Sequence, residues 1–194
     1  MDVNDPIARF GDAMTRAVAS EKTDPTATSL ATADTMGVPS LRMVLLKGWD
    51  ERGFIFYTNR DSRKAAELDS NPSAALCWYW PVIGEQVRVE GTVERVSDAD
   101  SDAYFASRPR ESQLGAWASR QSRPLEAYDL LQQRFADLTE MYEGKTVPRP
   151  RWWGGYRVIP SRIEFWKAGL HRLHHREAYV RADDGGWRVE LLNP

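Results

Sequence analysis

Two spacings of apolar residues divide the chain into regions of different predicted structure. Close to the N-terminus, apolar residues recur every three or four positions, at Ile7, Phe10, Met14 and Val18. Asp5-Pro6 precedes them as a helix cap followed by proline at the first helical position. This pattern predicts a helix over about 6–20.

After Asp24-Pro25 the pattern changes to short alternating or apolar runs, which predict β-strands. The runs are ATSLATAD, LRMVLLKGW, GFIFYTN, SAALCWYW and QVRVEGTVERV, and later GGYRVIP, RIEFWKA, HREAYVRA and WRVELL. Turn residues at 36–37, 50–53, 71–72 and 183–186 separate them at intervals that suit an antiparallel barrel or sandwich. Further helices are predicted over about 62–68, 98–106 and 125–142. The expected class is therefore mainly β with peripheral helices.

Composition favours one ordinary globular domain over residues 1–194. The net charge of −2 argues against a nucleic-acid-binding protein, which usually presents a strongly basic face. The lone Cys77 has no internal disulfide partner, and no apolar run approaches the ~20 residues that cross a bilayer. The first residues carry acids where a signal peptide carries bases, so we expect a cytoplasmic protein without membrane contact.

Two short motifs that suggest a P-loop and a metal site are not supported by the residues around them. The GKT sequence at 144–146 has Thr139 where a P-loop requires its first glycine, and it follows a predicted helix instead of a strand. The three histidines lie together in HRLHH, without a cysteine beside them. On a strand His174 and His175 would point to opposite faces, so we favour polar or ring-stacking roles and expect no metal site.

Basic and hydroxyl residues gather in two parts of the chain. Arg42 and Lys47 flank the apolar run LRMVLLK, and Arg63 and Lys64 open the predicted helix that follows. The stretch SRPRESQLGAWASRQSRP, residues 107–124, holds four arginines and four serines. A solvated helix start explains Arg63 and Lys64 equally well, but two such clusters predict two phosphorylated ligands or one ligand with two ends.

Longer segments closely resemble the pyridoxamine 5'-phosphate oxidases, in matching order and spacing from about Asp24 onward. They are RMVLLKGWDERGFIFYTNRDSRKAAEL, QVRVEGTVERV, YFASRPRESQLGAWASRQSRP, WGGYRVIPSRIEFW and RLHHR. The resemblance implies an antiparallel split β-barrel and a homodimer with FMN between its subunits. It also implies oxidation of pyridoxamine or pyridoxine 5'-phosphate to pyridoxal 5'-phosphate, with O2 as acceptor and H2O2 as product.

The same resemblance implies the site residues. It assigns FMN contacts to Arg42, Met43, Val44, Leu45, Leu46, Lys47, Tyr57, Thr58, Arg63, Lys64, Gln86, Gln121, Ser122, Trp166 and Arg176. It assigns substrate contacts to Lys47, Tyr104, Arg108, Ser112, Arg172 and His174. Arg172 and His174 are also the implied catalytic residues, which hold the substrate ring and bond its oxygen or its reacting group.

Departures from the family pattern keep alternatives open. Only four residues precede Asp5-Pro6, so we expect no N-terminal arm over the substrate. His175 stands where the family usually has Asp, and the chain ends in LLNP where the family more often ends in RLAP. A related flavoenzyme acting on another small molecule, as in phenazine biosynthesis, is one alternative. A non-catalytic FMN or pyridoxal phosphate binding protein is another, and a nucleic-acid module that uses the arginines and eight tryptophans is a third.

Overall fold

The structure, a computed structural model, describes residues 5–194. Its helices are α1 (Pro6–Ser20), α2 (Arg63–Ser70), α3 (Asp98–Ser107), α4 (Arg110–Ala118) and α5 (Tyr128–Met141), with a 3-10 turn, η1, at Leu170–Arg172. Its strands are β1 (Ala27–Ala33), β2 (Pro39–Asp50), β3 (Gly53–Asn59), β4 (Ser73–Trp80), β5 (Glu85–Arg95), β6 (Trp153–Lys167), β7 (His175–Arg181) and β8 (Trp187–Leu191). The expectation about an arm before Asp5 lies outside the described residues.

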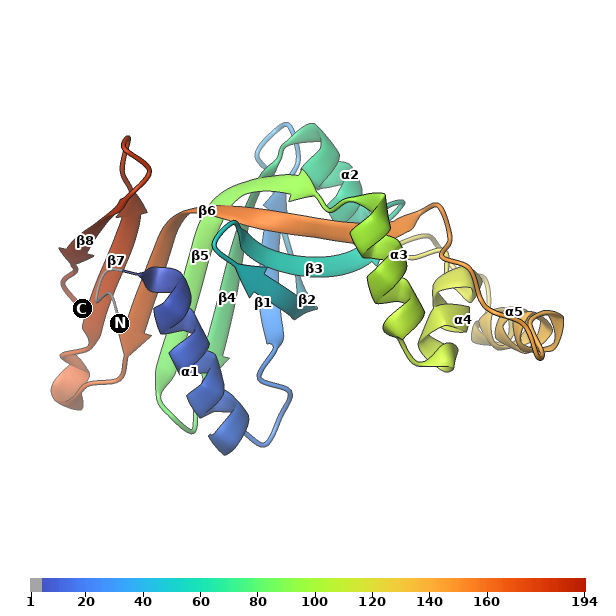
Figure 1. Ribbon diagram of the computed structural model, residues 1–194, viewed down its shortest axis with the longest axis horizontal. Coiled ribbons are helices and arrows are strands. Elements are labelled where there is room, and N and C mark those ends of the chain that lie inside the picture. Colours follow the sequence, from blue (N-terminus) through green and yellow to red (C-terminus); the bar gives the residue numbers. More distant parts are fainter. Residues whose placement is uncertain (1–4) are drawn as a thin grey trace.

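Six strands close into an antiparallel barrel. They follow the order β3-β2-β1-β4-β5-β6, and β6 returns to pair with β3, so neither end strand of this set has a free edge there. Strands β7 and β8 extend the sheet from the other half of β6 (Figure 1). The predicted mainly β architecture, an antiparallel split barrel with peripheral helices, is confirmed.

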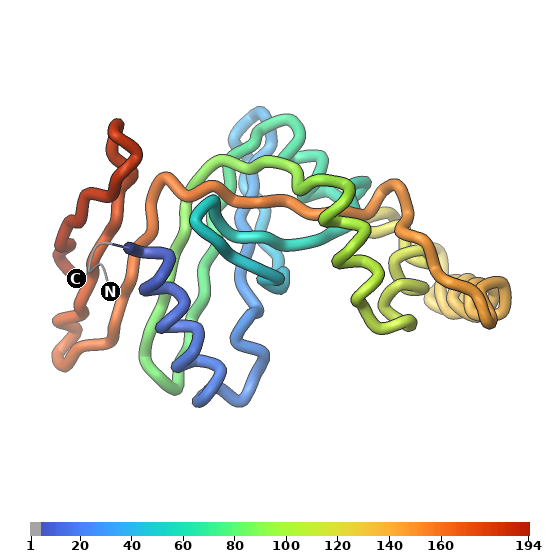
Figure 2. The backbone as a smooth tube through the Cα atoms, in the orientation of Figure 1, coloured from blue at the N-terminus to red at the C-terminus, as the bar shows by residue number. Residues whose placement is uncertain are grey.

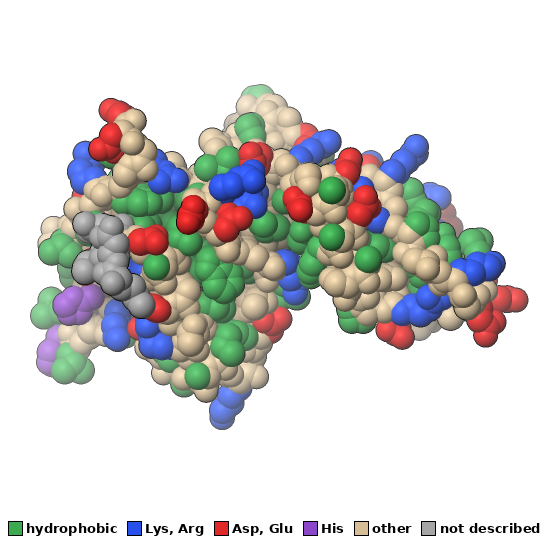
Figure 3. Space-filling model, viewed as in Figure 1, with side chains coloured by type: hydrophobic (Ala, Val, Ile, Leu, Met, Phe, Trp, Pro, Cys, Tyr) green, Lys and Arg blue, Asp and Glu red, His purple; other side chains and the backbone are tan. Residues whose placement is uncertain are grey.

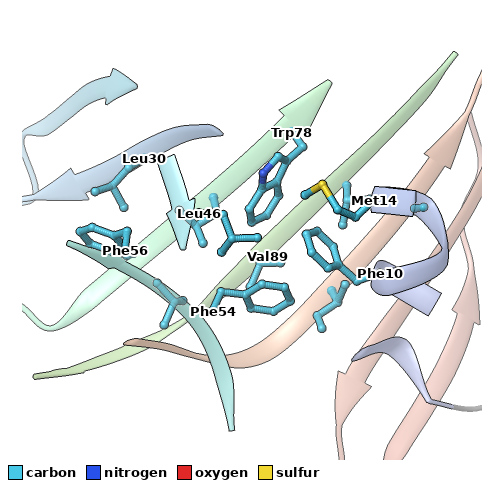
Figure 4. Packing of buried hydrophobic residues seen from close by; sticks show 14 of the residues in the cluster. Phe10, Met14, Leu30, Leu46, Phe54, Phe56, Trp78 and Val89 are labelled. Atoms are coloured by element: carbon cyan, nitrogen blue, oxygen red, sulfur yellow. The ribbon is translucent and has the colours of Figure 1, made fainter. Parts of the chain in front are cut away.

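Helix α1 packs its apolar face onto the barrel core. The Asp5 carboxylate caps the helix by accepting from the Ile7 and Ala8 amides. Phe10 is fully buried, and its ring meets Phe54 and Trp78 edge-on at 4.9 Å (Figure 4). Phe10 and Met14 are buried as predicted and Ile7 is half-buried, but at the end of the helix Ala17 is buried where Val18 was expected.

Strand β6 is one continuous element, whereas its sequence predicted two strands. Its first half pairs with β3 and β5, and its second half pairs with β5 and β7, so it runs across the molecule (Figure 2). The pairing with β5 shifts register at Gly91, where a Cβ atom would lie 2.0 Å from the Ile159 carbonyl oxygen. A glycine at this position permits the close approach by which β6 bends without breaking.

The helices α3, α4 and α5 gather at one end of β6. Helix α4 was not predicted, since its residues read as an Arg- and Ser-rich loop. It forms because Leu114 packs with Phe105, Val147 and Trp153 in a second apolar cluster. Among the described residues no helix is long and apolar enough to span a membrane.

Candidate functional site

A cleft of about 550 Å³ opens where β2, β3 and the start of α2 meet α3 and the segment after α4. We call it the β2–α2 cleft. Its lining residues are Ser40, Leu41, Arg42, Met43, Val44, Leu45, Lys47, Tyr57, Thr58, Arg63, Lys64, Tyr104, Arg108, Gln121, Ser122 and Trp153. Most of the predicted cofactor and substrate residues therefore share one space. Leu46 does not, because its side chain is buried in the barrel core.

One buried carboxylate anchors the two arginines on the floor of this cleft. Glu67 accepts a hydrogen bond from Arg63 Nε at 2.8 Å and one from Arg42 Nη2 at 3.2 Å. The hydroxyls of Thr32 and Ser40 also donate to it. Burial by itself would raise the pKa of this carboxyl, but these hydrogen bonds outweigh it and hold the pKa at about 2. Glu67 is therefore ionised at every physiological pH.

The start of α2 presents a buried cation without an anion. Lys64 is 8% exposed, and its Nζ donates to Thr58 Oγ1, Ser62 Oγ and Gln121 Oε1 at 3.1, 3.3 and 3.1 Å. All three acceptors are neutral, so burial, followed by repulsion from Arg42, lowers the pKa of Lys64 to about 8. Ser62 occupies the N-cap but makes no side-chain cap hydrogen bond, and the first turn holds no acid. A buried ammonium beside an uncapped helix N-terminus is an arrangement that favours an anion.

A stack of aromatic rings supports a second cation on the opposite wall. Tyr57 lies parallel to Tyr104 at 4.2 Å and to Trp153 at 5.2 Å. The Arg108 guanidinium lies 4.8 Å from the centre of the Trp153 ring, a cation–π contact. Its Nη1 is buried without a hydrogen-bond partner among the described residues, and burial lowers the pKa of Arg108. A buried N–H without an acceptor is costly unless a ligand supplies one.

A smaller cavity of about 380 Å³ extends this wall. It shares Tyr57, Arg108 and Trp153 with the cleft and adds Ser112 from α4. Ser112 therefore lies beside Arg108 as predicted, although it does not line the β2–α2 cleft itself. Burial raises the pKa of Tyr104, so its phenol stays protonated and available as a hydrogen-bond donor at neutral pH.

The remaining predicted residues form a separate group at the far end of β6. They are Gln86, Trp166, Arg172, His174 and Arg176, which we call the β6–β7 group. Gln86 and Arg176 flank Trp166 on neighbouring strands. The His174 ring lies 4.6 Å from the Trp166 ring, and its Nδ1 accepts the Gly169 amide, so the neutral imidazole carries its proton on Nε2. The two rings are tilted by 42° to each other, so His174 contacts an aromatic ring without stacking on it.

Arg172 and His174 both precede β7, in and just after a tight turn. Arg172 ends the turn η1, and both His171 and Arg172 have left-handed φ values of 56° and 64°. Strand β7 begins only at His175. A tight turn is required because the backbone folds back at Gly169, where a Cβ atom would lie 1.9 Å from the Leu173 carbonyl oxygen. The Arg172 side chain is exposed and makes no hydrogen bond or ion pair within residues 5–194.

Within one subunit, the β2–α2 cleft and the β6–β7 group lie far from each other. Trp153 in the cleft and Trp166 in the group lie at the two ends of β6, thirteen residues and therefore about 40 Å apart along the strand at ~3.3 Å per residue. The view in Figure 3 shows the histidines at the β7 side, at the opposite end of the molecule from the helices α4 and α5. The same view shows basic and acidic side chains interspersed over this face.

The four arginines of the 107–124 stretch divide among three places. Arg108 faces the cleft, whereas Arg110 is exposed and donates to the Lys145 and Tyr142 carbonyls just after α5. Gln121 and Ser122 line the cleft. Arg120 and Arg123 line a different cavity, of about 560 Å³, beside Trp117 and Trp152.

Two residues, Trp153 in the cleft and Glu67 beneath it, were missed at the level of sequence. Glu67 stands four residues after Arg63, a helical ion-pair spacing that signals contact but not burial. Trp153 stands in RWWGGY, where nothing in the pattern separates it from a core tryptophan. Only the packing of α3 against β6 shows that its ring supports Arg108.

Comparisons with known families agree over nearly the whole chain. Residues 14–142 match the family described as pyridoxamine 5'-phosphate oxidase. Residues 153–194 match the pyridoxine 5'-phosphate oxidase C-terminal dimerisation region. A pyridoxine/pyridoxamine 5'-phosphate oxidase from Anaeromyxobacter dehalogenans is 57% identical over 190 residues, which cover 98% of this chain and 96% of that protein. Its counterpart from Zymomonas mobilis is 50% identical and covers 98% of each chain.

Solved structures share the fold. PhzG from Burkholderia lata, crystallised with tetrahydrophenazine-1-carboxylic acid, superposes with a TM-score of 0.93 at 31% identity, covering 100% of this chain and 94% of that chain. A pyridoxamine 5'-phosphate oxidase-related, FMN-binding protein from Nostoc punctiforme superposes with a TM-score of 0.80 at 20% identity, covering 100% of both chains. The second likeness is evidence for the fold alone.

Replacing Lys64 with Met should stabilise the protein when no anion is bound. Folding lowers the pKa of Lys64 to about 8, so the variant should gain about 2–3 kcal/mol in free energy of unfolding at pH 7. As the pH rises above about 8, the unfolded wild-type chain binds more protons than the folded one, and wild-type stability rises. The difference between the two proteins should therefore close by about pH 10.

Urea unfolding at pH 7 and pH 10 measures this effect. Lys47→Met is the matched control, because Lys47 lines the same cleft but is exposed, and it should change stability little. A Lys64→Met protein no more stable than wild type at pH 7 would contradict the buried, unpaired cation.

Proposed function

The chain belongs to the pyridoxamine 5'-phosphate oxidase family, and from that premise we propose that it is an FMN-dependent oxidase of vitamin B6 phosphates. It converts pyridoxamine 5'-phosphate or pyridoxine 5'-phosphate to pyridoxal 5'-phosphate, with O2 as acceptor and H2O2 as product. The observation that carries this proposal is two cations on one cleft, the buried Lys64 and the half-buried Arg108, neither of which forms an ion pair among residues 5–194. Two phosphates, one on the cofactor and one on the substrate, satisfy both.

The residues around Lys64 fit the phosphate of FMN. Lys64 has only neutral acceptors, both terminal nitrogens of Arg63 are without a hydrogen-bond partner within residues 5–194, and the N-terminus of α2 lacks a side-chain cap. Charge-assisted hydrogen bonds from these groups favour a dianion at this position. Gln121 and Ser122 enclose the same end of the cleft.

The residues around Arg108 fit the substrate phosphate. The Trp153 ring and the neighbouring tyrosines fix the guanidinium on one face, and Nη1 remains without an acceptor. Lys47, Tyr104 and Ser112 supply an ammonium and two hydroxyls nearby. An arginine held in place in this way recognises phosphate with little loss of side-chain entropy on binding.

FMN, when bound, takes up the hydride of the substrate and returns it to oxygen. The protein's part is to bind and orient the reactants. We assign Arg172 to holding the substrate ring, because its guanidinium is the exposed and unpaired cation of the β6–β7 group. We assign His174 to a hydrogen bond from Nε2–H to the substrate, because Nδ1 already accepts the Gly169 amide.

The site draws on two subunits. The protein is a homodimer, since residues 153–194 match the dimerisation region of the family. We propose that each FMN lies between the β2–α2 cleft of one subunit and the β6–β7 group of the other. Support comes from the length of β6, which separates the two groups within one chain. The apolar side chains of Leu41 and Met43 on β2, 69% and 61% exposed in the single chain, also fit a subunit contact.

The likeness to PhzG raises the alternative of a substrate without phosphate. The ligand in that structure is a carboxylic acid, as its name states. The unpaired Nη1 of Arg108 and the hydroxyls beside it favour a phosphate ester here. The two readings differ in what the loss of Arg108 does to phosphorylated and unphosphorylated substrates.

Arg108→Ala should weaken binding of pyridoxine 5'-phosphate by roughly 1.5–3 kcal/mol, about ten- to a hundredfold in KM, because a charge-assisted phosphate contact is lost. The KM for unphosphorylated pyridoxine should hardly change, and FMN should stay bound. Arg110→Ala is the matched control, since Arg110 bonds backbone carbonyls at the end of α5 and lines neither cavity. Equal losses for both substrates would show that Arg108 does not read the phosphate.

Arg172→Ala should slow reduction of the bound flavin at least tenfold, or about 1.4 kcal/mol of barrier per factor of ten, with FMN affinity nearly unchanged. His174→Asn should do less harm, because an amide retains a hydrogen bond. Anaerobic stopped-flow absorbance isolates this step from the reaction with oxygen. His171→Ala is the control, because His171 has the same left-handed backbone and is exposed. Wild-type reduction rates in FMN-loaded Arg172→Ala protein would remove Arg172 from the reaction.

Co-expression of Arg108→Ala and Arg172→Ala chains should restore activity that neither variant has alone. In a hybrid dimer, one of the two symmetric sites contains both substitutions and the other contains neither. Random pairing makes half of the dimers hybrids, so the mixture should have about a quarter of wild-type activity at limiting substrate. Sites built within single chains would give no recovery. Equilibrium sedimentation should show about twice the 22.1 kDa chain mass, and a monomer retaining stoichiometric FMN would contradict the shared site.

A further inference from the structure

Glu67 is the buried acid closest to the proposed phosphate site, yet it is not among the residues that line the cleft. It lies on α2, one turn after Arg63, and is 5% exposed. Its Oε1 accepts from Arg63 Nε, and its Oε2 accepts from Arg42 and from the hydroxyls of Thr32 and Ser40. A carboxylate beneath an anion site needs an explanation, because its own charge repels the anion.

Each of the two arginines is held in a different way. Arg63 gives only its Nε to Glu67, which leaves both terminal nitrogens pointing away from that bond and unpaired within the described chain. Arg42 is almost fully engaged: Nη1 donates to the Leu30 carbonyl and Thr32, and Nη2 donates to Ser40 and Glu67. Glu67 is the one acceptor that the two guanidinium groups share.

Two physical effects of Glu67 on a bound phosphate oppose each other. Its charge weakens the positive field of the cleft. Its hydrogen bonds, however, fix side chains that otherwise lose about 2 kcal/mol of rotamer entropy when a ligand orders them. Arg63 is 61% exposed, so without its anchor it would sample many rotamers in water.

We propose that Glu67 is a positioning residue for the cofactor, and that it holds Arg63 and Arg42 in the orientation that receives the FMN phosphate. This inference rests on the proposed function, in which that phosphate lies at the start of α2. The cost of burying a lone carboxylate is compensated here by four donors, of which Ser40, Arg42 and Arg63 line the cleft and Thr32 lies buried beneath it. Glu67 thus favours binding of FMN over riboflavin, which lacks the phosphate, without contacting either flavin.

Two variants separate positioning from the effect of charge. Glu67→Asp keeps the buried charge but withdraws the carboxylate by one methylene, and Glu67→Gln keeps the length but removes the charge. Asp69→Asn is the matched control, since Asp69 lies on the same helix and pairs with Arg95 away from the cleft. Quenching of flavin fluorescence, titrated into the apoprotein, gives the Kd of FMN and of riboflavin for each variant.

If Glu67 positions the arginines, both of its variants should weaken FMN binding about tenfold or more, with riboflavin binding unchanged. The Asp69→Asn protein should bind both flavins as the wild type does. In an Arg63→Ala background, Glu67→Asp should have a much smaller effect, because the side chain that it orients is gone.

Other outcomes overturn the proposal. Tighter FMN binding by Glu67→Gln, with Glu67→Asp unchanged, would mean that only the charge acts. Equal weakening of FMN and riboflavin binding would mean that Glu67 merely supports the fold. If the Glu67→Gln protein does not fold, the Kd values of the Glu67→Asp protein alone test the proposal. A wild-type protein that binds riboflavin as tightly as FMN would refute the phosphate assignment itself, whatever the variants do.

Discussion

The uninterrupted course of β6 is the constraint on which the rest of the structure depends. Its first half closes the barrel against β3, and its second half leaves the barrel to carry β7 and β8. One strand therefore holds Trp153 in the β2–α2 cleft and Trp166 in the β6–β7 group. Since a single chain presents the two groups far apart, a two-fold dimer is the simplest way to unite them, and its symmetry produces two identical sites.

Charges in the cleft are arranged for a ligand more than for stability. Lys64 and Arg108 are desolvated but paired only with neutral groups or an aromatic face, which costs free energy in the protein alone. Glu67, in contrast, is fully satisfied by four donors. The acid of this region is thus compensated within the chain, whereas Lys64 and Arg108 have no anion of the described chain bonded to them.

The fold by itself does not distinguish the possible substrates. PhzG superposes with a TM-score of 0.93 although only 31% of residues are identical. The same barrel thus accommodates many different side chains, so a substrate has to be inferred from particular groups of the site. A phosphate ester is favoured here by an unsatisfied guanidinium nitrogen and its aromatic support, and not by the architecture.

The sequence by itself predicted most of the strands, the first helix and the family, because alternation, caps and long motifs are local properties of the chain. It predicted neither helix α4 nor the unity of β6, since both depend on partners distant in sequence. It gave no sign of the left-handed turn at Arg172, which the close approach at Gly169 imposes. The positions of Glu67 beneath the cleft arginines and of Trp153 beside Arg108 were decided only by tertiary structure, because burial and the direction of a hydrogen bond exist only after the barrel has closed.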